Sequence, residues 1–267
     1  MGQIIKSLLY PFEGEGYVRD PGRLIANQTY AQIFTGAGTT GNFGNPAVFL
    51  RGEDTNPYYE RSMFIDIVVD LRAYSFVTFT SASITMQASN ISMDETAWGT
   101  DLRNGIALVS QRETVRDHTV NAINYHEIYE GAVNGTEYAS RIGQAACIAA
   151  GNVTGNVTFT LNAAGISYLN SVKSKANLTG FALFGVVFGG QADNVTPTYL
   201  GVNNIHMFYT RNVRYMTLNY TTGTTGMQIN VGDAWKDATG GLINVGDEWK
   251  GIDDIDLNVG DAWKNKA

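Results

Sequence analysis

Met63-Phe64-Ile65-Asp66-Ile67-Val68-Val69-Asp70 is the centre of the strongest strand signal in the chain, which extends from Tyr59 to Leu71. Two sets of positions alternate along it. The apolar set is Met63, Ile65, Ile67 and Val69, and the mixed set is Phe64, Asp66, Val68 and Asp70. Side chains of a strand point to opposite faces in turn, so this pattern predicts a strand with one face in a core.

Segments of the same kind lie on both sides of it. We expect further strands at 24–34, 47–51, 77–87, 106–109, 125–130, 156–161, 181–188, 205–209 and 214–220. The one convincing helix is 162–173, because Asn162 can cap it and Ile166, Leu169 and Val172 fall on one face. Many short strands with almost no helix predict an all-β fold, a β-sandwich.

The last forty residues repeat one phrase three times. Ile229-Asn-Val-Gly-Asp-Ala-Trp-Lys236 returns at 243–250, with Glu248 in place of Ala234, and again at 257–264, so the starts are 14 residues apart. Each copy predicts a small β-hairpin, because Gly-Asp between two short arms is a turn signal. A two-residue loop places Trp235 opposite Asn230, whereas a three-residue loop places it opposite Val231.

Such a hairpin is too small to be stable alone, because two-stranded ribbons are marginal in water. The repeats are therefore either an assembly or docking module or an extension of the body's own sheet. We favour the first, since aromatic anchors concentrate binding energy at interfaces. The expected interface anchors are Trp235, Trp249, Trp263, Ile229, Val231, Ile243, Val245, Leu257 and Val259.

The order of several body motifs resembles the jelly-roll domains of the DNRLRE type. The similar passages are Asn42-Phe-Gly-Asn45, Glu60-Arg-Ser-Met-Phe-Ile-Asp66, Val77-Thr-Phe-Thr-Ser-Ala-Ser-Ile84, Phe159-Thr-Leu-Asn162 and Asn177-Leu-Thr-Gly-Phe-Ala-Leu-Phe184. The resemblance implies a jelly-roll β-sandwich with one short helix, followed by three short β-hairpin repeats. We expect an N-terminal arm at 1–23, the sandwich at 24–220 and the repeats at 221–267.

The repeated phrase resembles the "Asn-Val-Gly-Asp/Gly-x-Trp-Lys" repeats at the ends of tailed-phage virion proteins, over residues 229–264. Together with a jelly-roll body, it implies a virion structural protein: a tail, fibre or head-decoration subunit. The expected partners are other virion proteins and further copies of this chain, in a homo-oligomer for which a trimer is preferred. The expected location is the virion, assembled in the host cytoplasm.

Charge and hydropathy argue against other partners and locations. The net charge of −7 provides no basic patch for nucleic acid or for an anionic membrane. No segment approaches the roughly 20 apolar residues that cross a bilayer, and residues 1–7 do not match a secretory signal. The single cysteine, Cys147, lies among alanines, which predicts a small buried residue.

A search for catalytic or metal chemistry leads to an expectation of none, and no cofactor is expected. His118 and His126 are separated by eight residues, which matches no usual zinc spacing. Acidic residues that could pair for glycoside hydrolysis carry no recognisable motif; they are Asp94, Glu95, Asp101, Glu127, Glu130 and Glu137. We therefore expect a protein that is not an enzyme.

Aromatic residues within 88–155 suggest an alternative function, recognition of a host-surface carbohydrate. Sugars stack on exposed aromatic rings, and the possible glycan contacts are Trp98, Tyr125 and Tyr129. Packing of the same rings beneath loops is the competing and more frequent explanation. The two explanations differ in the exposure of the rings.

Overall fold

The computed structural model describes both a body and a tail. It covers residues 2–7, 13–18, 28–29, 40–42, 47–52, 58–74, 77–93, 97–110, 135–173, 180–198, 200–201, 204–222, 228–230, 235–237, 242–245, 248–251, 256–258 and 263–265. Only the backbone is described from 228 onwards and at 7, 13–18, 28–29, 40–42, 58–64, 66, 68, 181, 211–213 and 222. The chain divides into two compact units, residues 1–75 with 79–221, and residues 222–267 with 76–78.

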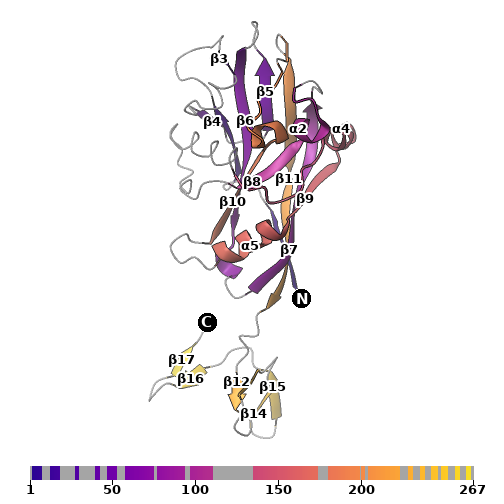
Figure 1. The fold of residues 1–267 in the computed structure, drawn as a ribbon. Helices are drawn as coiled ribbons and strands as arrows, with labels where there is room; N and C mark the ends of the chain where they lie inside the picture. The colour runs from indigo at the N-terminus through magenta and orange to yellow at the C-terminus, as the bar shows by residue number, and fades with distance from the viewer. Residues whose placement is uncertain are drawn as a thin grey trace. The chain divides into compact units, whose positions relative to one another are not determined.

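The body is an all-β sandwich built from antiparallel strands (Figure 1), which confirms the predicted fold class. Its strands are β1 (Gly2–Ser7), β2 (Glu13–Val18), β3 (Gln28–Thr29), β4 (Thr40–Asn42), β5 (Ala47–Gly52), β6 (Tyr58–Asp70), β7 (Val77–Ser92), β8 (Ile106–Ser110), β9 (Asn156–Thr160), β10 (Phe181–Phe188) and β11 (Ile205–Thr222). Its helices are the 3-10 helix η1 (Arg72–Tyr74), α2 (Asp101–Asn104), α4 (Gln144–Asn152), α5 (Ala163–Val172) and α6 (Gly189–Ala192).

Strand β6 is the element from which the two layers diverge. Met63 pairs with β2 on one edge and with β5 on the other, and Ile65 pairs with β2 and with β10 in the same way. One edge of β6 is therefore shared by β5 and β10. The sheet continues from β5 to β11, β7 and β9, and from β10 to β8, so two layers share one long strand.

The core lies between these layers. Ile65, Ile67 and Val69 are buried, as their alternation predicts. Strand β10 is buried on both faces from Ala182 to Phe188, which is why it is a continuous apolar run without alternation. The largest fully buried side chains are Phe79, Phe159, Phe184, Phe188, Phe208, Leu50, Ile65 and Ile67.

Helix α5 closes two open strand edges at once. The Asn170 side chain accepts a hydrogen bond from Phe79 N and donates one to Phe79 O, both 2.9 Å long, on β7 beyond the last residue paired with β9. The Tyr168 hydroxyl accepts a 2.9 Å hydrogen bond from Leu183 N, on β10 beyond the end of β8. Two polar side chains thus replace the missing strand partners. The cap is as predicted, because Asn162 Oδ1 accepts from Gly165 N at 2.9 Å.

Two sequence-based expectations are wrong in part. Residues 1–23 were expected to be an arm, but within them β1 pairs with β11, and β2 pairs with β4 and β6. The two adjacent isoleucines of β1 and the alternating glycines of β2 hide the strand pattern. Residues 162–173 are also not the one helix, since α4 contains nine residues. Its alanines give it no apolar stripe for periodicity to detect.

The tail consists of three hairpins, each a separate two-stranded sheet. Their strands are β12 (Gln228–Asn230) and β13 (Trp235–Asp237), β14 (Leu242–Val245) and β15 (Glu248–Gly251), and β16 (Asp256–Asn258) and β17 (Trp263–Asn265). Within the described part of the chain, no helix is both long and apolar enough to span a membrane.

Candidate functional site

The tail repeats share one backbone register. Trp235 pairs with Asn230, Trp249 with Asn244 and Trp263 with Asn258. This is the first of the two registers that the sequence allows. In the middle hairpin Val245 pairs with Glu248, so two residues separate the paired strands, the spacing typical of tight hairpins.

The hairpins do not extend the body's sheet through their described strands. Each is paired only within itself, and each strand has three or four residues. Sheets of this size have little apolar surface to stabilise them. The side chains of the expected anchors, and positions Val231 and Val259 altogether, lie outside the described residues. The three registers nevertheless place each tryptophan at the same position in its unit.

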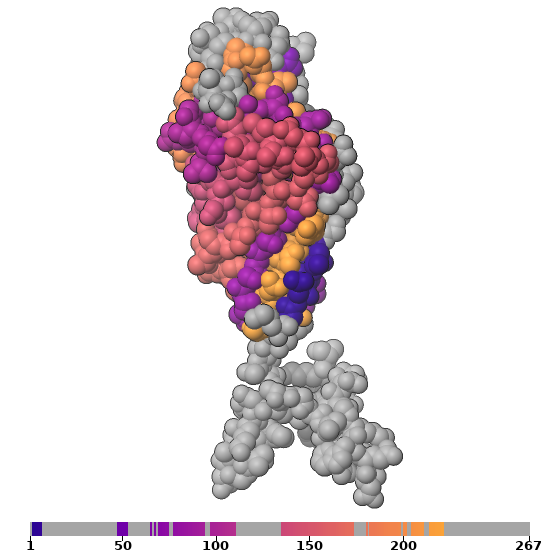
Figure 2. Space-filling view, turned by 90° about the vertical axis from the view of Figure 1, so that its right-hand side faces the viewer, coloured from indigo at the N-terminus to yellow at the C-terminus, as the bar shows by residue number. Residues whose placement is uncertain are grey.

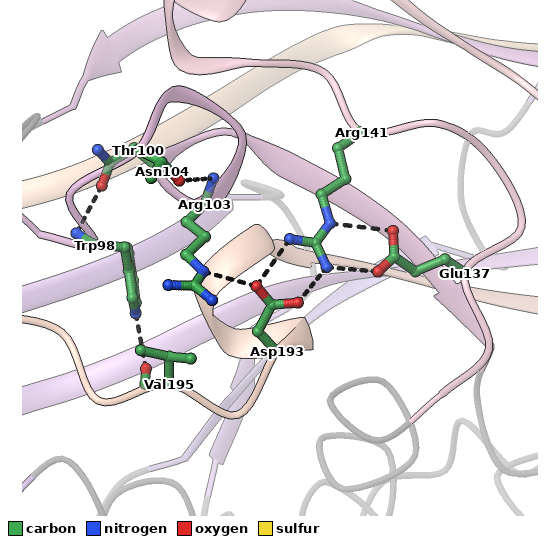
Figure 3. A network of polar contacts seen from close by, with 8 residues as sticks. All are labelled: Trp98, Thr100, Arg103, Asn104, Glu137, Arg141, Asp193 and Val195. Carbon is green, nitrogen blue, oxygen red and sulfur yellow. Dashed lines mark hydrogen bonds and ion pairs between the residues drawn. The ribbon is translucent and has the colours of Figure 1, made fainter.

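Trp98, a candidate glycan contact, is a core residue instead. Trp98 is 5% exposed, and its Nε1 donates a 2.8 Å hydrogen bond to Val195 O (Figure 3). Its backbone N donates to Asn104 Oδ1 at 2.9 Å. Because both the ring and its polar atom are enclosed, Trp98 has no free face for a sugar. The glycan assignment of Trp98 is therefore wrong, and packing beneath a loop is the correct explanation.

An aromatic cluster surrounds this indole. The ring of Trp98 lies 5.4 Å from that of Phe188 and 5.5 Å from that of His206, centroid to centroid. His206 is buried, and its Nε2 lies 2.9 Å from Asn104 O. Asn104 thus contacts both Trp98 and His206, and the histidine is part of the buried core. His118, His126, Tyr125 and Tyr129 lie outside the described residues.

An ion-pair network that the sequence did not predict lies beside this cluster. Arg141 is between two carboxylates, with Nη2 2.6 Å from Glu137 Oε1 and 2.5 Å from Asp193 Oδ1 (Figure 3). Arg103 Nε adds a second cation, 2.8 Å from Asp193 Oδ2. The network joins α2, the end of α6 and the segment before α4, which are up to 90 residues apart. Such separations leave no local sequence signal.

The pKa shifts in this network are those expected of ion pairs that hold segments of the fold together. The guanidinium groups of Arg141 and Arg103 lower the pKa of the Asp193 carboxyl, and the two carboxylates raise the pKa of Arg141. Glycoside hydrolysis requires a carboxylic acid with a raised pKa beside a carboxylate. Glu137, one of the acidic candidates, is held by two hydrogen bonds from Arg141. Asp101, another candidate, accepts from Ala145 N at 2.8 Å. Asp94, Glu95, Glu127 and Glu130 lie outside the described residues.

The shifted Asp193 pKa predicts a specific acid sensitivity. A carboxyl whose pKa is lower in the folded than in the unfolded chain stabilises the fold above the unfolded value of about 3.9, and this contribution is lost as the pH falls through the folded pKa. We expect Asp193→Asn to lower the urea midpoint at pH 7, and to lose less further stability than the natural chain between pH 5 and 3. Urea titrations at several pH values measure both. Parallel pH profiles for the two proteins would contradict the prediction.

Cys147 is buried, as predicted, with no exposed surface. Desolvation raises the pKa of its thiol to about 12. A thiol is a nucleophile only as the thiolate, so the native residue is inert at neutral pH.

No protein-family model matches this chain, and no curated protein is significantly similar to it.

Proposed function

We propose that this chain is a non-enzymatic structural subunit of a phage virion, in a tail, fibre or head-decoration position, which assembles through its sandwich and its tryptophan-bearing repeats. The observation that carries the proposal is the threefold repeat itself. The same tryptophan occupies the same register in three hairpins whose described strands pair only within themselves. A unit that cannot bury its own apolar face must be covered by something else.

A few described polar groups of the body are in keeping with a structural function. Arg141 forms ion pairs with Glu137 and Asp193, and His206 contacts a backbone carbonyl. A sandwich whose charged and aromatic groups stabilise its own packing is suited to hold binding surfaces in place. With Trp98 in the core, assembly is better supported than carbohydrate recognition, for which Tyr125 and Tyr129 remain the candidates.

The proposal is tested by removing the repeats. A chain that ends at Thr222 retains every described strand and helix of the body. We expect light scattering to give an oligomeric mass for the full chain and a monomeric mass for the shortened one. Circular dichroism and a cooperative urea transition serve as controls for folding. An unchanged oligomer after removal, with the body folded, would refute assembly through the repeats.

A further inference from the structure

We infer that β1 is an interface at which a second copy of this chain pairs, strand to strand and antiparallel, so that the sheet β9-β7-β11-β1 continues from one subunit into the next. The inference rests on the proposed function as an assembling subunit and specifies a contact within the body. It specifies a contact between two copies and leaves open the number of copies that the repeats bring together.

The outer edge of β1 is open within the described part of the chain. All six residues of β1 pair with β11, from Gly2 opposite Tyr220 to Ser7 opposite Tyr215, without a register shift. No other described strand pairs with β1. Figure 2 shows β1 at the surface beside β11. An edge strand exposes a row of unpaired N–H and C=O groups, which is a template for another strand.

Within β1 itself, the residues that usually protect an edge strand are few. Natural edge strands are commonly blunted by a charged side chain, a proline or a bulge. The strand contains neither proline nor bulge, and its one charged residue, Lys6, is half-buried opposite Met216. Lys6 Nζ donates to Asp70 O and lies 4.9 Å from the centre of the Tyr74 ring. Burial lowers the pKa of Lys6, in agreement with this half-buried position.

The outward face of β1 favours association. Ile5 is 65% exposed, so a large apolar side chain of this edge strand lies in contact with water. Beside it, Gln3 Nε2 donates to Asn219 Oδ1 at 3.0 Å, and Asn219 Nδ2 donates to Ser81 Oγ at 2.9 Å. This chain of hydrogen bonds fixes the outer surface across β1, β11 and β7, so it is preorganised for contact.

The absence of charge on the outward described face favours a second copy as the partner. The chain carries a net charge of −7, so two copies repel each other wherever acidic groups meet. The outward described positions around Ile5 hold no charged side chain. They are Gln3, Tyr215, Thr217, Asn219, Thr221, Ser81, Ser83, Gln87, Asn156, Thr158 and Thr160. This face therefore allows two identical acidic subunits to approach closely.

Symmetry makes the strand complementary to itself. If the outward faces of both copies stay on the same side and at least five residues of β1 are paired, antiparallel pairing places Ile5 opposite either Ile5 or Gln3 of the other copy. In the first register the two isoleucines are direct neighbours, and in the second they are diagonal, about 7–8 Å apart. Either register covers Ile5. A six-residue strand pair is small for an interface, so it depends on the high local concentration that the repeats provide.

A thiol cross-link tests the contact in the full chain. The only native cysteine, Cys147, is buried with its pKa raised to about 12, so it does not compete for a maleimide. An Ile5→Cys variant treated with a short bismaleimide is expected to give a covalent dimer as its main product. The matched control is Val153→Cys, at a site 77% exposed and after the end of α4, which is expected to give background levels only.

Two further measurements separate the possible failures. Ile5→Lys places a charge at the edge without removing a buried group, and we expect it to lower the mass measured by light scattering. An oligomeric natural chain without an Ile5→Cys dimer would overturn pairing through β1 and leave the proposed function intact. Equal cross-linking of the two cysteine variants would also overturn it. A monomeric natural chain at every concentration would overturn both proposals.

Discussion

A chain in which Trp235, Trp249 and Trp263 are all replaced by alanine is expected to be monomeric at concentrations at which the natural chain is oligomeric. An aromatic anchor that is buried at an interface contributes on the order of 2 kcal/mol or more, which is about a 30-fold change in affinity. The three anchors belong to one tail, so they act together. The loss from the triple variant is therefore far greater than that from any single one.

The single and double variants give a graded series that tests this explanation. When one of several linked contacts is lost, the remaining contacts still hold the partners together. Each contact that is lost removes part of the gain in affinity that comes from the raised effective concentration. We expect each single substitution to weaken association in part and each double substitution to weaken it further. Sedimentation velocity over a range of concentrations measures the apparent dissociation constant for every variant.

The chain supplies a matched control in the residue after each tryptophan. Lys236, Lys250 and Lys264 lie on the same three short strands. Their replacement by alanine changes the same hairpins to a comparable extent without removing an indole. Because ion pairs between charged side chains usually contribute much less than a buried aromatic anchor, we expect the triple lysine variant to associate as the natural chain does. Equal losses in the two triple variants would show that the hairpins bind through charge or backbone, not through the tryptophans.

The sequence predicted those parts of the fold that local periodicity records. The alternation of Ile65, Ile67 and Val69 identified β6, and the uninterrupted apolar run of β10 has the bounds expected for it. The cap at Asn162 was visible because capping depends on one residue type at one position. By contrast, β1 and α4 have no period that distinguishes them. Strand β1 contains two adjacent isoleucines, and α4 is rich in alanine on every side.

The candidate sites show why pairing over long distances was not predicted. The indole of Trp98 finds its acceptor at Val195, and Arg141 finds a carboxylate at Asp193, 52 residues away. No spacing rule connects such positions, because the contacts exist only after the layers have packed. The repeat register was different. It depends on a short connection within 14 residues, so the sequence could reduce it to two alternatives.

Trp98→Ala is expected to destabilise the body by about 3–5 kcal/mol, the usual range for removing a large aromatic side chain from a core. The loss comprises contacts with Phe188 and His206, and it leaves Val195 O without its indole donor. Trp98→Phe keeps most of the ring volume and removes the same hydrogen bond, so a smaller loss of roughly 1–3 kcal/mol is expected. Urea denaturation followed by circular dichroism measures both values.

Gly190 provides a test of whether the indole itself is responsible. A methyl group at Gly190 would overlap the ring of Trp98, so we expect Gly190→Ala to destabilise the natural chain by roughly 1–3 kcal/mol through overpacking. In a Trp98→Ala background the obstacle is gone, and the same substitution is expected to be nearly neutral. Two neighbouring residues that share one space give such non-additive free energies in a double-mutant cycle. Gly155→Ala is the control, because its methyl group would meet first the side chain of the exposed Val153, at 3.2 Å. Additive free energies at positions 98 and 190 would contradict the packing of the indole on α6, and with it the assignment of Trp98 to the core.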